Sequence, residues 1–378
     1  MSRKIFLITI LVLILIIIAA LLYLFVFGSK PQEIGKTPAA PESEIALPAN
    51  PAEPPVASLP QIPEVSKITQ VIASRVLGFA LSGNSMFYYD EDQGGFYRKA
   101  QAGDDAVIYG QGKFTQVKDI IWSPDKNQAI MVFNNDDYYH YEFASGASTK
   151  LAPKISNLFW IQEGKRIFYQ WNQTEGASEL IVAEPDGNNW AKIRDLGYNK
   201  ILLGSSPKID GPIAMAQNYG YGEGRNVYPI FNDGAAGPAI KLSNYGEKAK
   251  WSRTGERILY EATDPDTFDN YLWVVDFSGT NNYSLGVKSF VEKCVWNKTD
   301  EKIFCAVPSQ ALGAKAEAAD SSIDNFWELN TKTGEKRKVY DESESDAKFD
   351  ANNLWLSGNE DRLYFTDEKT GVYALRLD

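Results

Sequence analysis

The sequence predicts an all-β fold, a seven-bladed β-propeller built from four-stranded antiparallel blades. The first observation is a repeated unit of strand, tight turn and strand, clearest at residues 121–132, 159–169 and 250–260. The second is the spacing of this unit, because equivalent points follow one another at steps of 42, 38, 45, 46, 45 and 59 residues. These points are Ala80, Trp122, Trp160, Ser205, Trp251, Trp296 and Trp355. A period of about 40 to 45 residues with about four short strands in each unit is the signature of a propeller.

Each unit is expected to begin with its innermost strand, which carries the tryptophan. Turn-forming sequences such as 185–189 and 278–281 separate the third strand from the fourth. A tryptophan that recurs once per blade is more typical of packing between sheets than of a ligand box. The last unit supplies only three strands before the chain stops. The strand at residues 68–73 is therefore expected to complete this blade and close the ring.

The chain begins with an uncharged run of 23 residues, Ile5 to Phe27. At 1.5 Å per residue this run is long enough to cross a hydrocarbon core of about 30 Å. A cleaved signal peptide is the competing interpretation, but its apolar region is about 7 to 15 residues long. Residues 1–30 are therefore expected to form an uncleaved transmembrane anchor. Arg3 and Lys4 precede the run and place the N-terminus in the cytoplasm.

A proline-rich linker is expected to follow at residues 31–66, which contain nine prolines in 36 residues. Extended as polyproline II, it would reach on the order of 110 Å. The remaining 312 residues, 67–378, are enough for one large propeller domain.

The charge of the chain argues against nucleic acid as a partner. The whole chain carries −11, and residues 1–66 hold four basic and five acidic groups, which leaves −10 for the propeller. Binding of phosphate groups requires a basic face.

The two cysteines, Cys294 and Cys305, flank the turn of the sixth repeat. If Trp296 faces Ile303 across this hairpin, facing residue numbers sum to 599, and so do 294 and 305. The cysteines should then be cross-strand neighbours. In an exported protein this favours a disulfide, with two buried free thiols as the alternative.

The runs Trp122-Ser123-Pro124-Asp125-Lys126 and 251–258 resemble the TolB-like (WD40-like) β-propeller repeat of bacterial envelope proteins, usually Trp-Ser-Pro-Asp-Gly-Lys before a hydrophobic strand. The resemblance covers about residues 75–378. The sixth unit departs from it because 297–300 lacks the proline. The resemblance implies a docking platform in the cell envelope, anchored in the bacterial cytoplasmic membrane by a single span with the propeller outside the cytoplasm.

Catalytic motifs are scarce in this chain, and no catalytic residue or cofactor is expected. His140 is the only histidine and has no Gly-x-Ser-x-Gly motif beside it, so a packed or hydrogen-bonded histidine is expected. Zinc sites need more histidine and cysteine than the chain contains. The run of Asp264, Asp266 and Asp269 lacks the spacing and terminal glutamate of an EF-hand, which favours solvated loop carboxylates over a calcium site.

Charge separates between the two faces of the predicted propeller. Connections between the second and third strands hold 15 acidic and three basic groups, whereas turns between the first and second strands hold eight acidic and nine basic. The acidic face is therefore a candidate docking surface for a basic segment of another envelope protein, or for divalent cations. Ordinary solubilising loops are the alternative. The candidate residues are Asp90, Asp92, Asp136, Asp137, Tyr219, Tyr221, Asp264 and Asp266.

Two functions are compatible with these features of the sequence. The preferred one is a membrane-tethered, non-catalytic protein-binding or scaffolding module of the bacterial cell envelope. The alternative is a propeller enzyme, of glycosidase or lyase type, that acts on cell-surface glycans at the central channel. Such enzymes need acidic or basic groups that point into the channel. The tryptophan-bearing strands end in Ser, Asn, Gly and apolar residues, which favours the first function.

Overall fold

The computed structural model describes residues 66–377 except 104, 162, 175–176, 218–225, 244, 265, 268, 311–321 and 345–346. The chain divides into two units, residues 1–63 and 64–378, and the described residues all belong to the second. Among them no helix is both long and apolar enough to cross a membrane. The predicted anchor at residues 5–27 lies outside the described part, and so does the predicted linker apart from Ser66.

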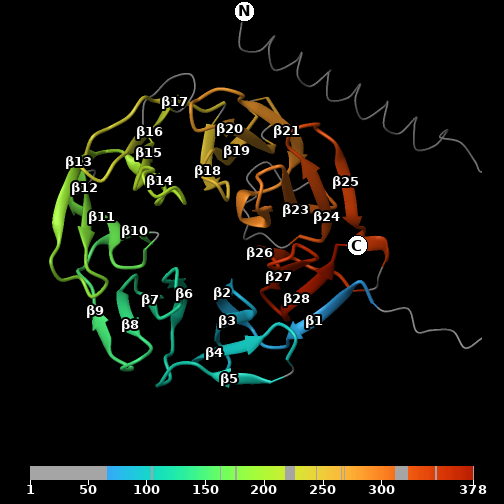
Figure 1. Ribbon diagram of the computed structural model, residues 1–378, viewed down its shortest axis with the longest axis horizontal. Coiled ribbons are helices and arrows are strands. Elements are labelled where there is room, and N and C mark those ends of the chain that lie inside the picture. The colour runs from blue at the N-terminus through green and yellow to red at the C-terminus, as the bar shows by residue number, and fades with distance from the viewer. Residues whose placement is uncertain are drawn as a thin grey trace, which may run out of the picture. The chain divides into compact units, whose positions relative to one another are not determined.

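The described residues form seven four-stranded antiparallel sheets arranged as blades around a central axis (Figure 1). The predicted fold class is therefore confirmed. We name the strands of a blade A to D from the axis outward. Because neighbouring strands are antiparallel, the A–B and C–D turns lie on one face of the propeller, here called the A–B face. The B–C and D–A connections lie on the other, here called the B–C face.

The blades follow one another along the chain, and the strands of each blade are, from A to D, as follows. Blade 1 contains β2 (Val76–Ser82), β3 (Ser85–Asp90), β4 (Gly95–Ala100) and β5 (Ala106–Ile108), and blade 2 contains β6 (Val117–Trp122), β7 (Gln128–Phe133), β8 (Tyr138–Glu142) and β9 (Ser148–Lys150). Blade 3 contains β10 (Ile155–Trp160), β11 (Ile167–Thr174), β12 (Ala177–Ala183) and β13 (Ala191–Gly197), and blade 4 contains β14 (Lys200–Leu203), β15 (Ala214–Gln217), β16 (Asn226–Ile230) and β17 (Ile240–Lys241). Blade 5 contains β18 (Tyr245–Trp251), β19 (Arg257–Thr263), β20 (Asn270–Asp276) and β21 (Tyr283–Lys288), and blade 6 contains β22 (Cys294–Trp296), β23 (Lys302–Pro308), β24 (Asp324–Asn330) and β25 (Lys336–Tyr340). Blade 7 contains β26 (Ala351–Leu356), β27 (Arg362–Asp367), β28 (Gly371–Arg376) and β1 (Ile68–Ile72), and two 3-10 turns, η1 (Val291–Lys293) and η2 (Glu342–Glu344), lie before β22 and β26.

The first and last strands close the ring in blade 7. Strand β1 pairs antiparallel with β28, with Ile68 opposite Leu375 and Ile72 opposite Val372. This is the place that the sequence analysis gave to residues 68–73. Gly371 makes the approach possible, because a Cβ atom there would lie 2.1 Å from the carbonyl oxygen of Ile72.

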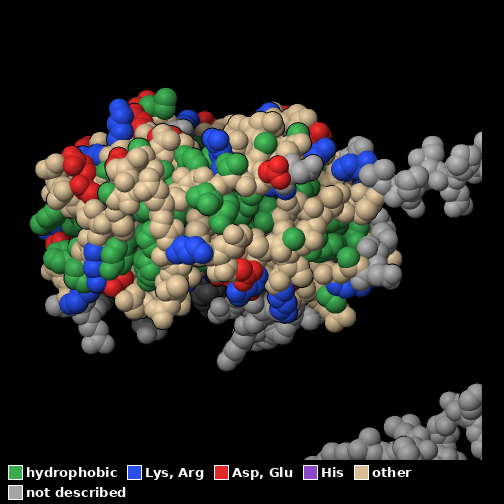
Figure 2. Space-filling model, turned by 90° about the horizontal axis from the view of Figure 1, so that it is seen from below, with side chains coloured by type: hydrophobic (Ala, Val, Ile, Leu, Met, Phe, Trp, Pro, Cys, Tyr) green, Lys and Arg blue, Asp and Glu red, His purple; other side chains and the backbone are tan. Residues whose placement is uncertain are grey.

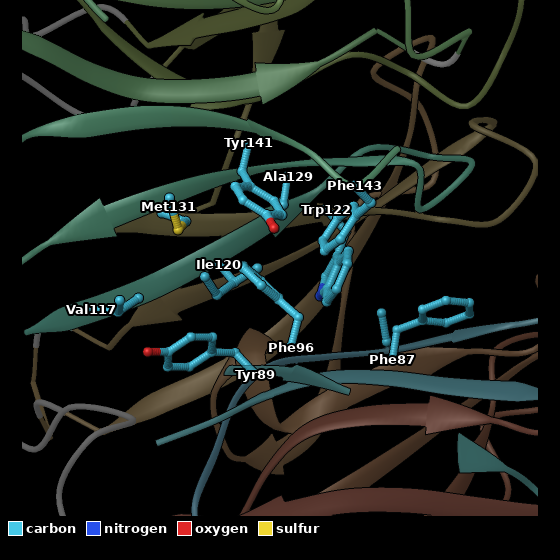
Figure 3. Close-up of a cluster of buried hydrophobic side chains, with 11 residues drawn as sticks. Phe87, Tyr89, Phe96, Val117, Ile120, Trp122, Ala129, Met131, Tyr141 and Phe143 are labelled. Atoms are coloured by element: carbon cyan, nitrogen blue, oxygen red, sulfur yellow. The ribbon is translucent and has the colours of Figure 1, made fainter. Parts of the chain in front are cut away.

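Aromatic side chains fill the space between blades 1 and 2 (Figure 3). The ring of Trp122 stacks on that of Phe143 with centroids 5.2 Å apart, and Phe96 stacks on Tyr141 at 5.3 Å. The indole N–H of Trp122 donates to the carbonyl of Gly78 in blade 1. The tryptophan of the repeat therefore packs between blades, as expected, and also satisfies its polar atom there.

The same hydrogen bond recurs around the ring but not in every blade. Trp160 Nε1 donates to the Ile121 carbonyl at 3.0 Å, and Trp251 Nε1 donates to the Gly204 carbonyl at 2.9 Å. Each acceptor lies in the preceding blade. In blade 6, Trp296 Nε1 is buried and has no hydrogen-bond partner among the described residues. The contact between blades 5 and 6 therefore lacks the hydrogen bond from the tryptophan N–H to the preceding blade.

The outer rim is partly apolar. In the edge-on view, apolar side chains lie at mid-height, and many charged side chains lie toward the two faces (Figure 2). Strand β5 is the outermost strand of blade 1, and 50% of Val107 and 75% of Ile108 is exposed there.

The disulfide expected in the sixth repeat is present. Cys294 and Cys305 face each other across β22 and β23 and are bonded to each other. Neither residue is exposed.

Replacing both cysteines by alanine should lower the free energy of unfolding by about 3 kcal/mol, because the bond closes a short loop in the unfolded chain. The two sulfurs are 11 positions apart in sequence. Chemical denaturation of the purified propeller measures the loss. Cys294→Ala alone should cost nearly as much as the double change, since either change removes the bond, and a single variant as stable as the wild type would contradict this account.

Candidate functional site

A cavity of about 460 Å³ lies at the A–B end of the central channel, between the innermost strands of blades 3 to 7. Four repeat tryptophans contribute to its wall, namely Trp160, Trp251, Trp296 and Trp355. The A–B turns of blades 4 and 5 complete it with Ser205, Ser206, Pro207, Ser252 and Arg253. Of the described residues that line this cavity, only Lys250 and Arg253 carry a charge. We call it the channel-mouth cavity.

Lys250 is placed there by the register of β18, where it directly precedes Trp251. Its ammonium group donates to the carbonyl oxygen of Cys294 at 2.7 Å, across the contact between blades 5 and 6. Burial lowers the pKa of Lys250 to about 8, against the opposing effect of the negative charge of Glu292. An amine with this pKa is partly neutral near pH 8 and can accept a proton.

Arg253 stands at the rim of the same cavity. Its side chain is exposed, and no hydrogen bond or ion pair joins the guanidinium group to another described residue. It is therefore available to an anion from solution.

Asp300 fixes the turn that carries Arg253. Its buried carboxylate accepts hydrogen bonds from the backbone N–H of Arg253 at 2.8 Å and of Thr254 at 3.3 Å, and from the Thr254 hydroxyl. In the next blade, Glu360 likewise accepts from the N–H of Lys298 at 2.6 Å. Both acidic residues have positive φ angles, 58° and 61°.

The equivalent turns of other blades show why an acidic residue is needed here. In blade 3 the corresponding residue is Gly164, which packs against Pro124 of blade 2. A proline has no N–H to offer, whereas Arg253 and Lys298 occupy its position in blades 5 and 6 and each has one. The acidic side chain in the following blade satisfies that N–H.

Asp300→Ala should lower the free energy of unfolding by about 2 kcal/mol. Loss of the bonds that this buried carboxylate accepts costs about 1.5–3 kcal/mol or more, and a residue other than glycine still has to adopt a positive φ. Asp300→Asn keeps one acceptor oxygen for these donors and should lose less. Urea denaturation of both variants checks this order, and equal losses would show that the acceptor geometry does not matter.

The acidic candidates predicted as a docking surface lie on the B–C face, opposite the channel-mouth cavity. Asp90 is only 2% exposed, and its carboxylate accepts from the backbone N–H and the side-chain amide of Gln93. It therefore holds a turn and cannot serve as an exposed docking residue. The other candidate aspartates of blades 1 and 2 form ion pairs: Asp92 with Arg75 at 2.8 Å, Asp136 with Lys118 at 3.0 Å and Asp137 with Lys150 at 2.6 Å.

The remaining candidates are divided between described and undescribed residues. Asp264 accepts from the N–H groups of Asp266 and Thr267, so it holds its own loop, and Asp266 is exposed. Tyr219 and Tyr221 lie outside the described residues. Whether this face binds a partner stays a prediction.

His140 is buried and hydrogen-bonded, as expected. Its Nε2 lies 2.7 Å from the side-chain oxygen of Gln128, and only 9% of the residue is exposed. Burial lowers the pKa of His140. It has the surroundings of a structural histidine in blade 2.

The sequence analysis missed Lys250 and Arg253, although two signals pointed to them. The residue before the tryptophan is apolar or glycine in the other blades, as at Ile121, Phe159 and Val295, and only blade 5 has a lysine there. Arg253 replaces the proline of the repeat. Lys250 and Arg253, three positions apart, both depart from the repeat, and such departures mark residues that the fold itself does not require.

No family model matches the chain, and no curated protein matches it. Two solved structures of oligogalacturonate lyase, one from Vibrio parahaemolyticus and one in complex with manganese, match with TM-scores of 0.61 and 0.59. In both cases the identity is 11%, and the match covers 82% of this chain and 93% of the other.

Two further structures bear on the family resemblance. The β-propeller domain of the Trilobed protease from Pyrococcus furiosus matches with a TM-score of 0.53 and 11% identity over 80% of this chain and 96% of that one. A putative TolB from Agrobacterium tumefaciens matches with a TM-score of 0.44 and 12% identity over 72% and 94%. The match to the protease domain, with a TM-score above 0.5, shows that the chain shares its propeller fold.

The comparisons correct the preferred function. A non-catalytic scaffolding module was expected, but the two lyase structures cover 82% of this chain, so the propeller-enzyme alternative fits the comparisons better. No group of three or more His, Cys, Asp or Glu side chains that could hold a metal ion occurs among the described residues. At 11% identity the likeness shows a shared fold, and the chemistry must be argued from the cavity itself.

Proposed function

We propose that this protein is a lyase-type enzyme that binds an acidic oligosaccharide in the channel-mouth cavity and cleaves it by β-elimination. The observation that carries the proposal is the composition of the cavity: apolar tryptophan walls with Lys250 and Arg253 as the only charged lining residues of the described chain. Ligand pockets combine apolar walls with a few polar groups that fix orientation. This cavity suits a ring with apolar faces and a negative charge, as in a uronic acid residue.

The chemistry needs a base and a cation, and the cavity offers one of each. The neutral amine of Lys250 takes the proton from C5 of the uronic acid residue, next to its carboxylate. The electron pair of the C5–H bond forms the C4–C5 double bond, the C4–O bond breaks, and the departing oxygen takes a proton from water. Arg253 pairs with the substrate carboxylate and stabilises the negative charge that develops on it in the transition state.

Hydrolysis fits this cavity less well. Most glycoside hydrolases use two carboxyl groups on either side of the scissile bond. No aspartate or glutamate occurs among the described residues that line the cavity. Elimination by a lysine requires no carboxyl group of the enzyme. Of the two enzyme types considered, glycosidase and lyase, the cavity therefore supports the lyase.

The expected location agrees with this activity. A span at residues 5–27 would hold the enzyme in the membrane, with residues 31–66 as a spacer, so that the propeller meets glycans outside the cytoplasm.

The test is an elimination assay with galacturonate oligomers on the purified propeller, which follows the ultraviolet absorbance of the unsaturated product. Binding is measured separately by quenching of tryptophan fluorescence, because four tryptophans line the cavity. We expect quenching by the acidic oligomers and no quenching by their methyl esters. Quenching by acid and ester alike, without product, would overturn the proposal.

A further inference from the structure

A second cavity, of about 900 Å³, opens on the A–B face between blades 3 and 4. It meets the channel-mouth cavity, because Ser205 lines both. In blade 3, Trp160 lines the channel-mouth cavity and the next residue, Ile161, lines the second. The two cavities are therefore adjacent and share part of their wall. We call the second cavity the blade 3–4 groove.

The two cavities differ in charge. The described residues that line the groove include Glu163, Asp210 and Asp233 against Arg166 and Lys208, whereas those of the channel mouth carry two cations and no carboxylate. The Lys208 ammonium is also paired, at 2.6 Å, with Glu256, and Glu163 is paired with Lys165 at 3.9 Å. Both of these partners lie outside the groove lining, so the lining itself keeps three carboxylates against two cations. The groove therefore has a negative balance, which disfavours a second acidic sugar there.

The groove also has an apolar wall in contact with solvent. Ile209 is 88% exposed, and Phe231 is half-buried beside it in the lining. Apolar side chains among hydrogen-bonding groups are the usual surroundings of a bound small molecule. A sugar ring with hydroxyl groups but no charge fits both the wall and the charge balance.

We propose that the blade 3–4 groove binds an uncharged sugar residue of the same chain whose acidic residue occupies the channel mouth. The preferred substrate is then a heteropolymer in which uronic acid residues alternate with uncharged sugars. This inference rests on the proposed function, since it extends the same site. In this proposal, the groove makes binding depend on the length of the oligosaccharide and on the order of its acidic and uncharged sugars. The chemistry remains with Lys250 and Arg253.

The test compares two series of oligosaccharides by tryptophan fluorescence: alternating oligomers of glucuronic acid and N-acetylglucosamine, and oligomers of galacturonic acid alone. In the alternating series, the dimer should bind about 10-fold more tightly than glucuronic acid alone, which corresponds to filling the groove. In the galacturonic series, the gain from monomer to dimer should be less than about 2-fold, because the second acid meets a negative groove.

Ile209→Lys should exchange the two preferences. The new cation should improve the binding of the galacturonic dimer about 5-fold and remove most of the gain from monomer to dimer in the alternating series. Because Ile209 is 88% exposed, the change should leave the fold intact. The matched control is Ile108→Lys, since Ile108 is a 75% exposed isoleucine on the outermost strand of blade 1.

The outcomes separate this inference from the proposed function. If dimers bind and Ile209→Lys changes neither series, the groove is not a sugar site and the channel mouth acts alone. If no acidic monomer or dimer binds, the proposed function fails and the groove assignment fails with it. An equal length gain in both series would overturn the charge argument.

Discussion

Removal of residues 372–378 is expected to unfold the whole propeller rather than to detach one strand. Strand β28 lies between β27 and β1, so its loss leaves β1 without a hydrogen-bond partner, leaves β27 paired on one side only, and opens the ring. Val372, Ala374 and Leu375 are almost completely buried. Burial of one large aliphatic side chain contributes about 1.5–3 kcal/mol, and the stability of a domain is only about 5–15 kcal/mol. Circular dichroism during heating should therefore show no cooperative transition, or one lowered by more than about 10 °C.

Two further variants separate closure from simple truncation. Removal of Asp378 alone should leave the melting temperature unchanged. Gly371→Val keeps every strand but places a side chain 2.1 Å from the Ile72 carbonyl, at a residue whose φ is 117°. It should destabilise the protein by several kcal/mol, on the order of other strained substitutions. A truncated protein that melts at the wild-type temperature would show that the ring does not depend on this seam.

Lys250→Met is expected to lower the kcat of elimination by about 10²–10⁴-fold, the usual contribution of a positioned base. The amine, whose pKa burial lowers to about 8, is the group proposed to take the C5 proton. In the wild-type enzyme, only about a tenth of the amine is neutral at pH 7, so the rate should rise tenfold per pH unit below pH 8 and level off above it. The Lys250→Met variant should not show this rise of the rate with pH.

Matched variants distinguish the base from other cations. Lys118→Met removes an exposed lysine that pairs with Asp136 in blade 2, and it should leave kcat and its pH profile unchanged. Arg253→Met should mainly raise KM, because Arg253 binds the substrate carboxylate, and should lower kcat to a smaller extent. If Lys250→Met keeps the wild-type pH profile, the titrating group is another residue and the assignment of the base is wrong.

Much of the fold was predictable because propellers repeat their local rules. The Trp-Ser-Pro-Asp-Lys run at Trp122 and its echo at Trp251 specify a strand, a turn and a strand with the apolar period of a sheet. Seven copies leave one blade a strand short, and residues 68–73 were the unassigned β-segment. The pairing of Cys294 with Cys305 likewise followed from hairpin register alone, because facing residues on two antiparallel strands have a constant sum.

The acidic docking surface shows what sequence counting cannot provide. Asp90 and Asp136 both lie in or beside B–C loops, and each adds one negative charge when the charged residues of these loops are counted. The structure buries Asp90 against Gln93 and pairs Asp136 with Lys118. Burial and ion pairing depend on residues that meet only after the strands have aligned, so a total of loop charges overstates the charge that a partner would meet.

The sequence by itself determined the number of blades, the seam that closes them and the cross-strand position of the two cysteines, because each follows from periodicity or from the register of neighbouring strands. Only the tertiary structure decided where a ligand could bind. Lys250 and Arg253 belong to blade 5, whereas Trp160, Trp296 and Trp355 come from blades 3, 6 and 7. Curvature of the ring brings these residues to one cavity, and the packing of blade 6 against blade 5 provides the burial that lowers the pKa of Lys250. Such convergence depends on contacts between distant parts of the chain, which no local pattern encodes.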